Sequence, residues 1–253
     1  MASGKGILIN ALGGLVLREG RVSRVRDAGP RFRWLSVRGD GLRDLDWTPG
    51  DKVQVLLPGL DMRTYTPLCW DRAAGTTELL LYRNQPVTES AATERPGTRW
   101  IRTVQEGDAC RFVGPQRSLT VPATSAPVVL FGDETSFAVA RALSSGASRP
   151  PACVFEVSAT SECTQVLMEL GLSDSVCIER TAEDAHLSTV NERLQDFLDR
   201  ARDRDMDRDR ETSLLMTGRA QSIQALQARR RAAGQQRPHK TKAYWSLGKA
   251  GLD

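Results

Sequence analysis

Histidine and lysine are scarce in this chain, and the usual metal-binding spacings are missing. The 253 residues include two histidines, His186 and His239, and lysine is so rare that arginine carries nearly all of the basic charge. Neither an HExxH nor a CxxC spacing occurs. Because such spacings supply the ligands of many structural zinc and iron–sulfur sites, we expect neither kind of site here.

Cysteine is infrequent too, and its spacing does not indicate a disulfide framework. The odd number of cysteines, and their scatter in and beside apolar stretches, favour buried free thiols in a reducing compartment. We therefore expect a cytoplasmic protein. The five cysteines are Cys69, Cys110, Cys153, Cys163 and Cys177.

No apolar run is long enough to cross a bilayer. Residues 7–17 could pass for the core of a signal peptide, but charged residues follow at 18–21 without a small-x-small cleavage site. We expect this segment to pack on the fold, with no membrane insertion.

The composition is that of a folded protein, with 40% hydrophobic and 26% charged residues. The net charge of +4 is mixed along the chain, so it does not require a nucleic-acid partner. Nothing in the sequence requires more than a monomer.

The first half of the chain has the pattern of β-structure. Short apolar or alternating runs are separated by Gly, Pro and Asp turn signals, as in a sandwich or small barrel. The expected strands are residues 21–26, 31–38, 52–57, 78–82 and 109–113.

The pattern changes at a Pro-flanked linker, residues 122–127. Beyond it, expected strands (128–131, 153–157, 176–179 and 214–217) alternate with expected helices (135–144, 163–170, 187–200 and 220–233). Repeated βα units indicate a parallel sheet. We therefore predict an antiparallel β-barrel domain over residues 1–122, followed by a parallel-sheet α/β nucleotide-binding domain over 127–253.

One short string in the first domain suits flavin binding. Arg63 could hold a pyrophosphate bidentately, and Tyr65, two residues on and on the same face, could stack on a flat ring. The hydroxyl of Thr66 could meet the flavin N5. The alternative interpretation is that the four residues Arg63, Thr64, Tyr65 and Thr66 are ordinary surface residues of a sheet.

Four strings together resemble the siderophore-interacting protein family, a branch of the ferredoxin–NADP reductase-like flavoproteins. They are Arg63-Thr-Tyr-Thr-Pro-Leu, Gly114-Pro-Gln-Arg-Ser-Leu, Leu130-Phe-Gly-Asp-Glu-Thr-Ser-Phe-Ala and Lys242-Ala-Tyr-Trp-Ser-Leu-Gly-Lys. The resemblance implies FAD in the barrel domain and NAD(P)H across the domain cleft. It implies hydride transfer to the flavin, and then single-electron reduction of Fe(III) held by a siderophore.

The resemblance also assigns residues. Those implied in cofactor binding are Arg63, Thr64, Tyr65, Thr66, Thr98, Arg99, Asp133, Glu134, Thr135, Gly218, Arg219, Tyr244 and Trp245. The substrate side is assigned Lys52, Gln54 and Lys249. Plain alternatives exist for several of these: an Asp N-cap at Asp133, a solvent-facing Arg219, and a core role for the Tyr244–Trp245 pair.

The sequence departs from the family at two places. Members commonly carry His-Gly and then a Gly-Pro-x-Ser-x-Trp loop around the FAD diphosphate. Here residues 95–100 read Arg-Pro-Gly-Thr-Arg-Trp, with Arg95 in place of a Gly. Gln54 stands where many members have a basic residue near the siderophore.

Three hypotheses therefore remain open. The first is a ferric-siderophore reductase, the second a flavin reductase with another acceptor, and the third a small-molecule-binding protein without FAD. NADPH is expected from the family and the arginine supply, with NADH as the alternative. The hydroxyls of Ser158, Thr160 and Ser161 are candidates to hold its 2′-phosphate.

Overall fold

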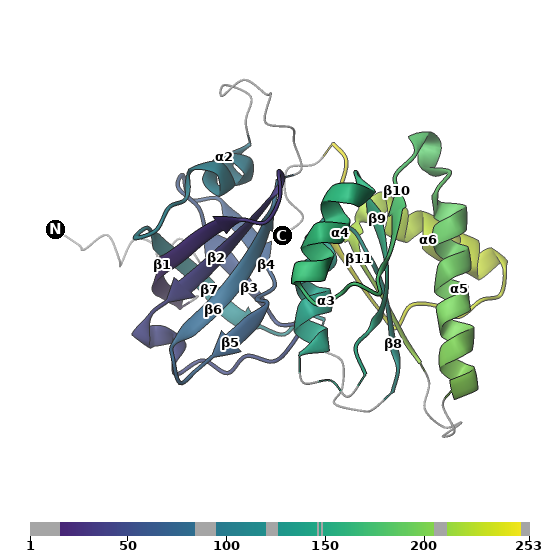
Figure 1. Ribbon diagram of the computed structural model, residues 1–253, viewed down its shortest axis with the longest axis horizontal. Coiled ribbons are helices and arrows are strands. Elements are labelled where there is room, and N and C mark those ends of the chain that lie inside the picture. Colours follow the sequence, from purple (N-terminus) through teal and green to yellow (C-terminus); the bar gives the residue numbers. More distant parts are fainter. Residues whose placement is uncertain are drawn as a thin grey trace. The chain divides into compact units, whose positions relative to one another are not determined.

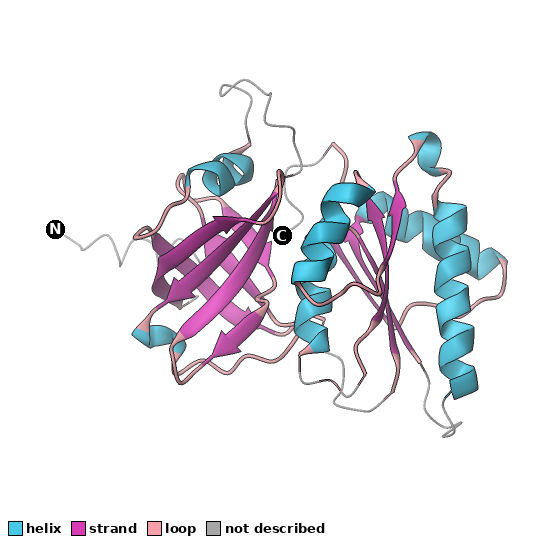
Figure 2. Ribbon diagram, viewed as in Figure 1, coloured by secondary structure: helices cyan, strands magenta, loops and turns pink. Residues whose placement is uncertain are grey.

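The computed structural model describes residues 16–83, 95–119, 126–145, 147, 149–204 and 212–248. The chain divides into two compact units, Met1–Ser118 and Leu119–Asp253, both drawn in Figure 1. Unit 1 contains an antiparallel sheet, and unit 2 contains a parallel sheet with helices (Figure 2). The predicted fold class is therefore confirmed.

Unit 1 is built on a seven-stranded sheet with the order β4-β3-β7-β1-β2-β6-β5. Its strands are β1 (Leu17–Asp27), β2 (Phe32–Arg38), β3 (Lys52–Leu56), β4 (Met62–Tyr65), β5 (Cys69–Asp71), β6 (Thr76–Tyr82) and β7 (Ala109–Gln116), with a 3-10 turn η1 (Asp40–Leu42). Every ladder is antiparallel. The edge strand β4 also contacts β6, so the sheet curls over its own core.

The core of unit 1 follows from alternation along the strands. In β3, Val53 and Val55 are buried while Lys52, Gln54 and Leu56 are half-buried. This is the period of two expected for a sheet with one buried face. Leu35, Leu81 and Phe112 from three other strands complete the same apolar cluster.

Helix α2 (Pro96–Thr103) closes one end of this core with Trp100 and Ile101. Its C-terminal carbonyls are bound by Arg33 of β2, whose Nη1 lies 2.8 Å from both the Ile101 and the Arg102 carbonyl oxygens. A cation at the negative end of a helix is favourable. Arg33 therefore fixes the orientation of α2 from that end.

Unit 2 is a five-stranded parallel sheet with the order β10-β9-β8-β11-β12. The strands are β8 (Val128–Gly132), β9 (Ala152–Val157), β10 (Val176–Glu179), β11 (Ser213–Arg219) and β12 (Lys240–Trp245). They alternate with η2 (Glu134–Ser136), α3 (Phe137–Ser144), α4 (Thr160–Glu169), η3 (Ala182–Asp184), α5 (Leu187–Arg204) and α6 (Ala220–Ala232).

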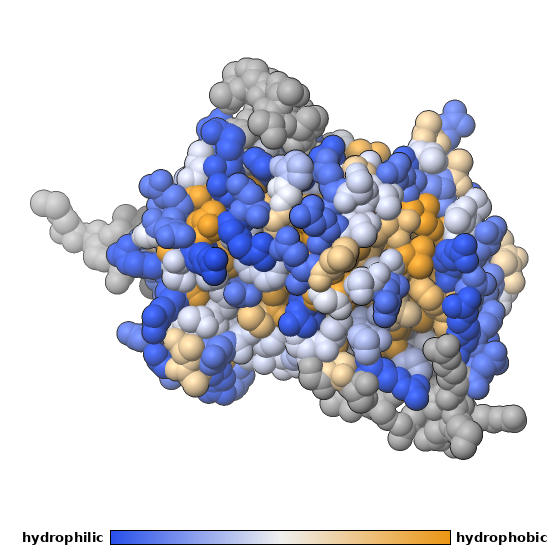
Figure 3. Space-filling model, viewed as in Figure 1, coloured by the Kyte–Doolittle hydropathy of each residue, from blue (hydrophilic) through white to orange (hydrophobic). Residues whose placement is uncertain are grey.

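Helices cover both faces of this sheet, which explains why its inner strands β8, β9 and β11 are almost continuously apolar. Figure 1 shows α3 and α4 on one face and α5 and α6 on the other. Leu194 and Leu198 of α5 and Leu226 of α6 pack on Val129 and Met216 of the sheet. The face drawn in Figure 3 is mainly hydrophilic, with small separate apolar patches.

The cysteines are free thiols, as predicted, and Cys110, Cys153 and Cys163 are buried. Burial raises the pKa of both Cys110 and Cys153 to about 12, so these thiols stay protonated. Among the described residues no helix has the length and apolar character needed to cross a membrane.

Leu194→Ala is expected to lower the free energy of unfolding by about 3 kcal/mol, because Leu194 is fully buried between α5 and the sheet. Urea unfolding provides the measurement. The matched control is Glu192→Ala on the exposed side of α5, which should change stability by less than about 0.5 kcal/mol. Equal losses in the two variants would contradict this description of the core.

Candidate functional site

Strand β4 presents the residues of the flavin-type string on two faces of the sheet. Arg63 lies opposite Val55 in the β3–β4 ladder, and Tyr65 lies opposite Val53. Both valines are buried in the core of unit 1. Because directly paired residues project to one face, Arg63 and Tyr65 share the inner face of the sheet. Thr64 lies opposite Gln54 and projects with it to the other face.

The N-terminus of α2 lies beside Arg63. A Cβ atom at Gly97 would lie 3.3 Å from the Arg63 Nε, so glycine allows the side chain of Arg63 to pass close to the first turn. Pro96 lies in this turn, and the N-cap residue Arg95 makes no side-chain hydrogen bond to the helix. The N–H groups of the first turn and the Arg63 guanidinium thus form one positively charged region. A diphosphate matches this arrangement.

Tyr65 is braced by the same helix. Its ring lies with its centroid 6.0 Å from that of Trp100, at an interplanar angle of 41°. Trp100 is buried on α2, whereas Tyr65 is half-buried at the edge of the core. The strand that carries Arg63 and the helix that faces it are therefore held together by an aromatic contact.

The other predicted residues of unit 1 have less defined surroundings. Thr66 follows β4 directly and is half-buried, as is Thr98 in the first turn of α2, while Arg99 is exposed. Lys52 begins β3 opposite Gln116. Their contacts with a cofactor or substrate stay predictions, and Lys249 lies outside the described residues.

In unit 2 the strand order reverses between β8 and β11, with β9 and β10 on one side and β12 on the other. Ligands of such sheets bind at the carboxyl ends of the strands at this point. Asp133 follows β8 there, and Gly218 lies near the end of β11. A Cβ atom at Gly218, where φ is +97°, would lie 2.5 Å from the Asp133 carboxyl. Glycine is therefore required for both conformation and space.

Asp133 is completely buried and accepts hydrogen bonds from two directions. Its Oδ1 accepts from the backbone N–H of Thr135 (2.9 Å) and from the Thr135 hydroxyl, and its Oδ2 accepts from the Trp245 indole N–H (2.7 Å). Burial, and next the charge of Glu134, raise the pKa of Asp133 to about 6. Asp133 caps η2, as in the alternative interpretation of this residue, and its contact with a cofactor stays a prediction.

Glu134 joins the ends of three strands. Its carboxylate accepts two bonds from Arg180 Nη2, at 2.6 and 2.8 Å, and one from the backbone N–H of Ser158 at 2.6 Å. Burial by itself would raise the pKa of Glu134, but the hydrogen bonds and charge of Arg180 outweigh it and hold the pKa below its usual value. Glu134 is therefore ionised, and it neutralises Arg180.

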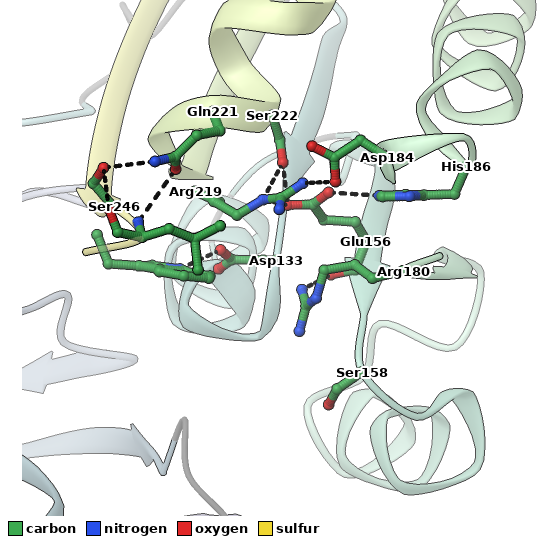
Figure 4. Close-up of polar contacts among 12 residues, drawn as sticks. Asp133, Glu156, Ser158, Arg180, Asp184, His186, Arg219, Gln221, Ser222 and Ser246 are labelled. Atoms are coloured by element: carbon green, nitrogen blue, oxygen red, sulfur yellow. Dashed lines mark hydrogen bonds and ion pairs between the residues drawn. The ribbon is translucent and has the colours of Figure 1, made fainter. Parts of the chain in front are cut away.

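A third buried carboxylate, Glu156, contacts the neighbouring polar groups (Figure 4). Its Oε1 accepts from the Ser222 hydroxyl at 2.6 Å, and its Oε2 lies 2.8 Å from His186 Nε2. The Nδ1 atom of His186 accepts from the backbone N–H of Thr181. The proton of a neutral His186 is therefore on Nε2, from which it is donated to Glu156.

Arg219 belongs to this network and is not solvent-facing. Its side chain is 8% exposed, its Nε donates to the Ser222 hydroxyl at 2.6 Å, and its Nη2 donates to Asp184. The Nε also lies 3.4 Å from Glu156. The charge of Arg219 is thus balanced within unit 2. Its predicted contact with a cofactor phosphate stays a prediction.

The terminal aromatic residues lie at the end of β12, and both are half-buried. Trp245 is fixed by its bond to Asp133. The following turn is fixed by Gln221, whose Nε2 donates to Ser246 Oγ at 2.8 Å. Trp245 is therefore positioned at the strand-order reversal together with Asp133 and Gly218.

Glu156, Arg180 and His186 were not predicted as site residues from the sequence. A signal for the first two exists, since Glu156 interrupts the apolar strand β9 and Arg180 directly follows β10. Charged residues at such positions indicate groups at the carboxyl edge of a parallel sheet. His186 carries no comparable signal.

Asp133→Asn and Glu134→Gln are expected to respond to pH with opposite signs. The pKa of Asp133 is raised from 3.8 to about 6 on folding, so its stabilising contribution is lost as the pH rises through that range. Relative to the wild type, Asp133→Asn should therefore gain about 3 kcal/mol of unfolding free energy between about pH 4 and about pH 7.

The lowered pKa of Glu134 gives the reverse sign, because its contribution is present at neutral pH and is lost as the pH falls through its folded-state value. Glu134→Gln should therefore be more destabilising at neutral than at acidic pH. Urea unfolding of both variants across this range is the measurement. A shift of the two variants in the same direction would refute the assignment.

Gly218→Ala is expected to lower the free energy of unfolding by more than about 3 kcal/mol, since the new methyl group meets a buried carboxylate. The control is Gly234→Ala, which has a positive φ of +63° but no atom within 4 Å of the added Cβ. We expect the control to lose about 1 kcal/mol, from backbone conformation alone. Thermal or urea unfolding distinguishes the two, and similar losses would argue against close packing at Gly218.

No family model matches the chain, and no curated protein matches it significantly. Solved structures do. A siderophore utilization protein from T. fusca has a TM-score of 0.66 at 21% identity, over 94% of this chain and 96% of that one. The siderophore-interacting protein SipS from Aeromonas hydrophila has a TM-score of 0.67 at 15% identity, over 93% and 94%.

A ferredoxin reductase in carbazole 1,9a-dioxygenase is also similar, with a TM-score of 0.64 at 16% identity, over 91% of this chain and 70% of that chain. The resemblance expected from the sequence strings is thus confirmed as a likeness of fold. The chain has the fold of the siderophore-interacting proteins and ferredoxin reductases over nearly its whole length.

Proposed function

We propose that the chain is a flavin-dependent NAD(P)H oxidoreductase whose acceptor is ferric iron held by a siderophore. The observation that carries the proposal is the meeting of Arg63 with the N-terminus of α2, on the face of β4 that also carries Tyr65. Arg63 and the helix N-terminus supply positive charge for a diphosphate, and Tyr65 supplies an aromatic ring for a flat heterocycle joined to it.

The residues present fit FAD at this place. The first-turn N–H groups of α2 receive no side-chain cap, and Gly97 leaves room beside Arg63. Arg63 would hold the diphosphate, and Tyr65 would support the isoalloxazine ring. In this proposal α2 takes the place of the family's diphosphate loop. The diphosphate then approaches the backbone at Gly97, and Arg95 lies outside this contact, at the N-cap of the helix.

Unit 2 would hold the pyridine nucleotide at the carboxyl edge of its sheet, near Asp133, Gly218 and Trp245. When bound, FAD supplies the conversion of a two-electron hydride donor into single-electron transfers. Oxidation of one NAD(P)H then reduces two Fe(III) to two Fe(II) and releases one proton. The solved structures named above support this choice of acceptor through their own descriptions.

A second candidate is a reductase of the same kind with another electron acceptor. It is favoured by the uncharged Gln54, which shares its sheet face with Thr64, and by the likeness to a ferredoxin reductase. Trapping Fe(II) with a ferrous chelator during turnover with a ferric siderophore distinguishes the two candidates. Reduction of dyes without Fe(II) release would favour the second.

Arg63→Ala is expected to weaken FAD binding at least about 10-fold, because charge-assisted contacts to the diphosphate are lost. Arg63→Lys should be intermediate, since lysine keeps the charge but not the paired donors. The measurement is FAD titration followed by the visible spectrum and flavin fluorescence. Arg111→Ala is the control, because Arg111 forms an exposed ion pair with Glu19 in unit 1. Unchanged FAD affinity in Arg63→Ala would refute the site.

A further inference from the structure

The carboxyl ends of β9 and β10 form one edge of the unit 2 sheet, because the two strands are parallel neighbours. Ser158 and Thr160 follow β9, Glu179 is the last residue of β10, and Arg180 directly follows it. In nucleotide-binding sheets of this kind, the end of the second strand meets the 2′ position of the adenine ribose. A carboxylate there suits a 2′-hydroxyl, whereas an arginine suits a 2′-phosphate.

Glu179 already occupies the N-terminus of α4. Its Oε1 accepts the backbone N–H of Thr160 at 2.8 Å, and the Thr160 side chain also donates to its carboxylate. These hydrogen bonds hold the pKa of Glu179 below its usual value, so it is an anion at neutral pH. The first turn of α4 therefore carries the negative charge of Glu179 at the place where a phosphate would need free N–H donors.

Arg180 is directed inward and is neutralised. Its Nη2 contacts both oxygens of Glu134, and its Nη1 donates to the carbonyl oxygen of Glu156 at 2.9 Å. The backbone N–H of Ser158 is also bound by Glu134. The backbone N–H groups of Ser158 and Thr160, the Thr160 hydroxyl and both terminal nitrogens of Arg180 are thus bound to carboxylates or a carbonyl.

The remaining charge of this edge is negative. Residues 158–163 and 176–185 contain a single basic residue, Arg180, and four acidic ones, Glu162, Glu179, Glu183 and Asp184. Arg219, which lies nearby in Figure 4, is bound to Asp184 and Ser222. A 2′-phosphate carries close to two negative charges, and bringing it to this edge would cost electrostatic energy that a hydroxyl does not.

We propose that this chain uses NADH in preference to NADPH, and that Glu179 sets the preference by excluding a 2′-phosphate and accepting a hydrogen bond from the ribose. The inference rests on the proposed oxidoreductase function and reverses the expectation of NADPH drawn from the sequence. A carboxylate has more acceptor sites than the Thr160 contacts use, so a ribose hydroxyl can be accommodated.

The direct test is nucleotide binding to the purified protein by calorimetry, which does not depend on turnover. We expect 5′-AMP to bind at least about 10-fold more tightly than adenosine 2′,5′-bisphosphate. In steady-state assays with ferricyanide as acceptor, kcat/KM for NADH should exceed that for NADPH by a similar factor.

Glu179→Lys should raise the affinity for adenosine 2′,5′-bisphosphate relative to 5′-AMP at least about 10-fold, because the repelling charge becomes an attracting one. Glu179→Gln keeps an acceptor for Thr160 and should give a smaller change of the same sign, so loss of the helix cap cannot mimic the result. The control is Glu169→Lys, an equal charge change at the exposed last residue of α4, which should alter the ratio less than about 2-fold.

The outcomes distinguish failure of the NADH preference from failure of the proposed oxidoreductase function. Equal or tighter binding of the 2′,5′-bisphosphate by the wild type overturns the NADH preference and leaves the oxidoreductase intact. An unchanged ratio in Glu179→Lys overturns the role of Glu179. If neither nucleotide binds and neither coenzyme is oxidised, the proposed function fails and the preference fails with it.

Discussion

The carboxyl edge of the unit 2 sheet depends on one buried ion pair, Glu134 with Arg180. It joins the turn after β8 to the end of β10, and the same carboxylate holds the backbone after β9 through Ser158. Removing one partner of such a pair leaves an uncompensated buried charge, which typically costs about 3–5 kcal/mol. This contact therefore links the three chain segments that follow β8, β9 and β10, in addition to the backbone ladders between those strands.

The same edge concentrates negative charge that the rest of the unit has to accommodate. Asp133 is buried next to Glu134 and is stabilised as an anion only in part, by the donors of Thr135 and Trp245. Glu156 is balanced by Arg219 and by the proton that His186 donates. A cluster of buried carboxylates lowers the stability of the fold. Carboxyl groups with shifted pKa values are often found at functional sites.

Much of the fold could be predicted from the sequence, because periodic apolar runs report burial directly. All nine strands and four helices expected from such runs are present with small changes of boundary. The elements that were not predicted lack a clear apolar run: β4 and β5 are very short, and β12 is a polar edge strand. Helix α2 falls on the segment that the family resemblance compared with a loop, although Pro96 begins a helix. The positions of Asp133 and Gly218 at the ends of expected strands could be predicted from the sequence. The Glu134–Arg180 pairing could not, since 46 positions separate the two residues and only the parallel register brings them together.

Arg33 has a consequence for how a ligand would arrive in unit 1. It clamps the carbonyl end of α2 from strand β2, and Trp100 anchors the middle of the helix in the core. The opposite end is therefore pre-organised before any anion is present. At the proposed site an anion would then meet a first turn that is already formed in residues 96–98, so little conformational entropy would be lost within α2. The geometry offered at the N-terminus of α2 thus depends on Arg33 and Trp100, which hold the other end and the middle of the helix and lie away from the proposed anion.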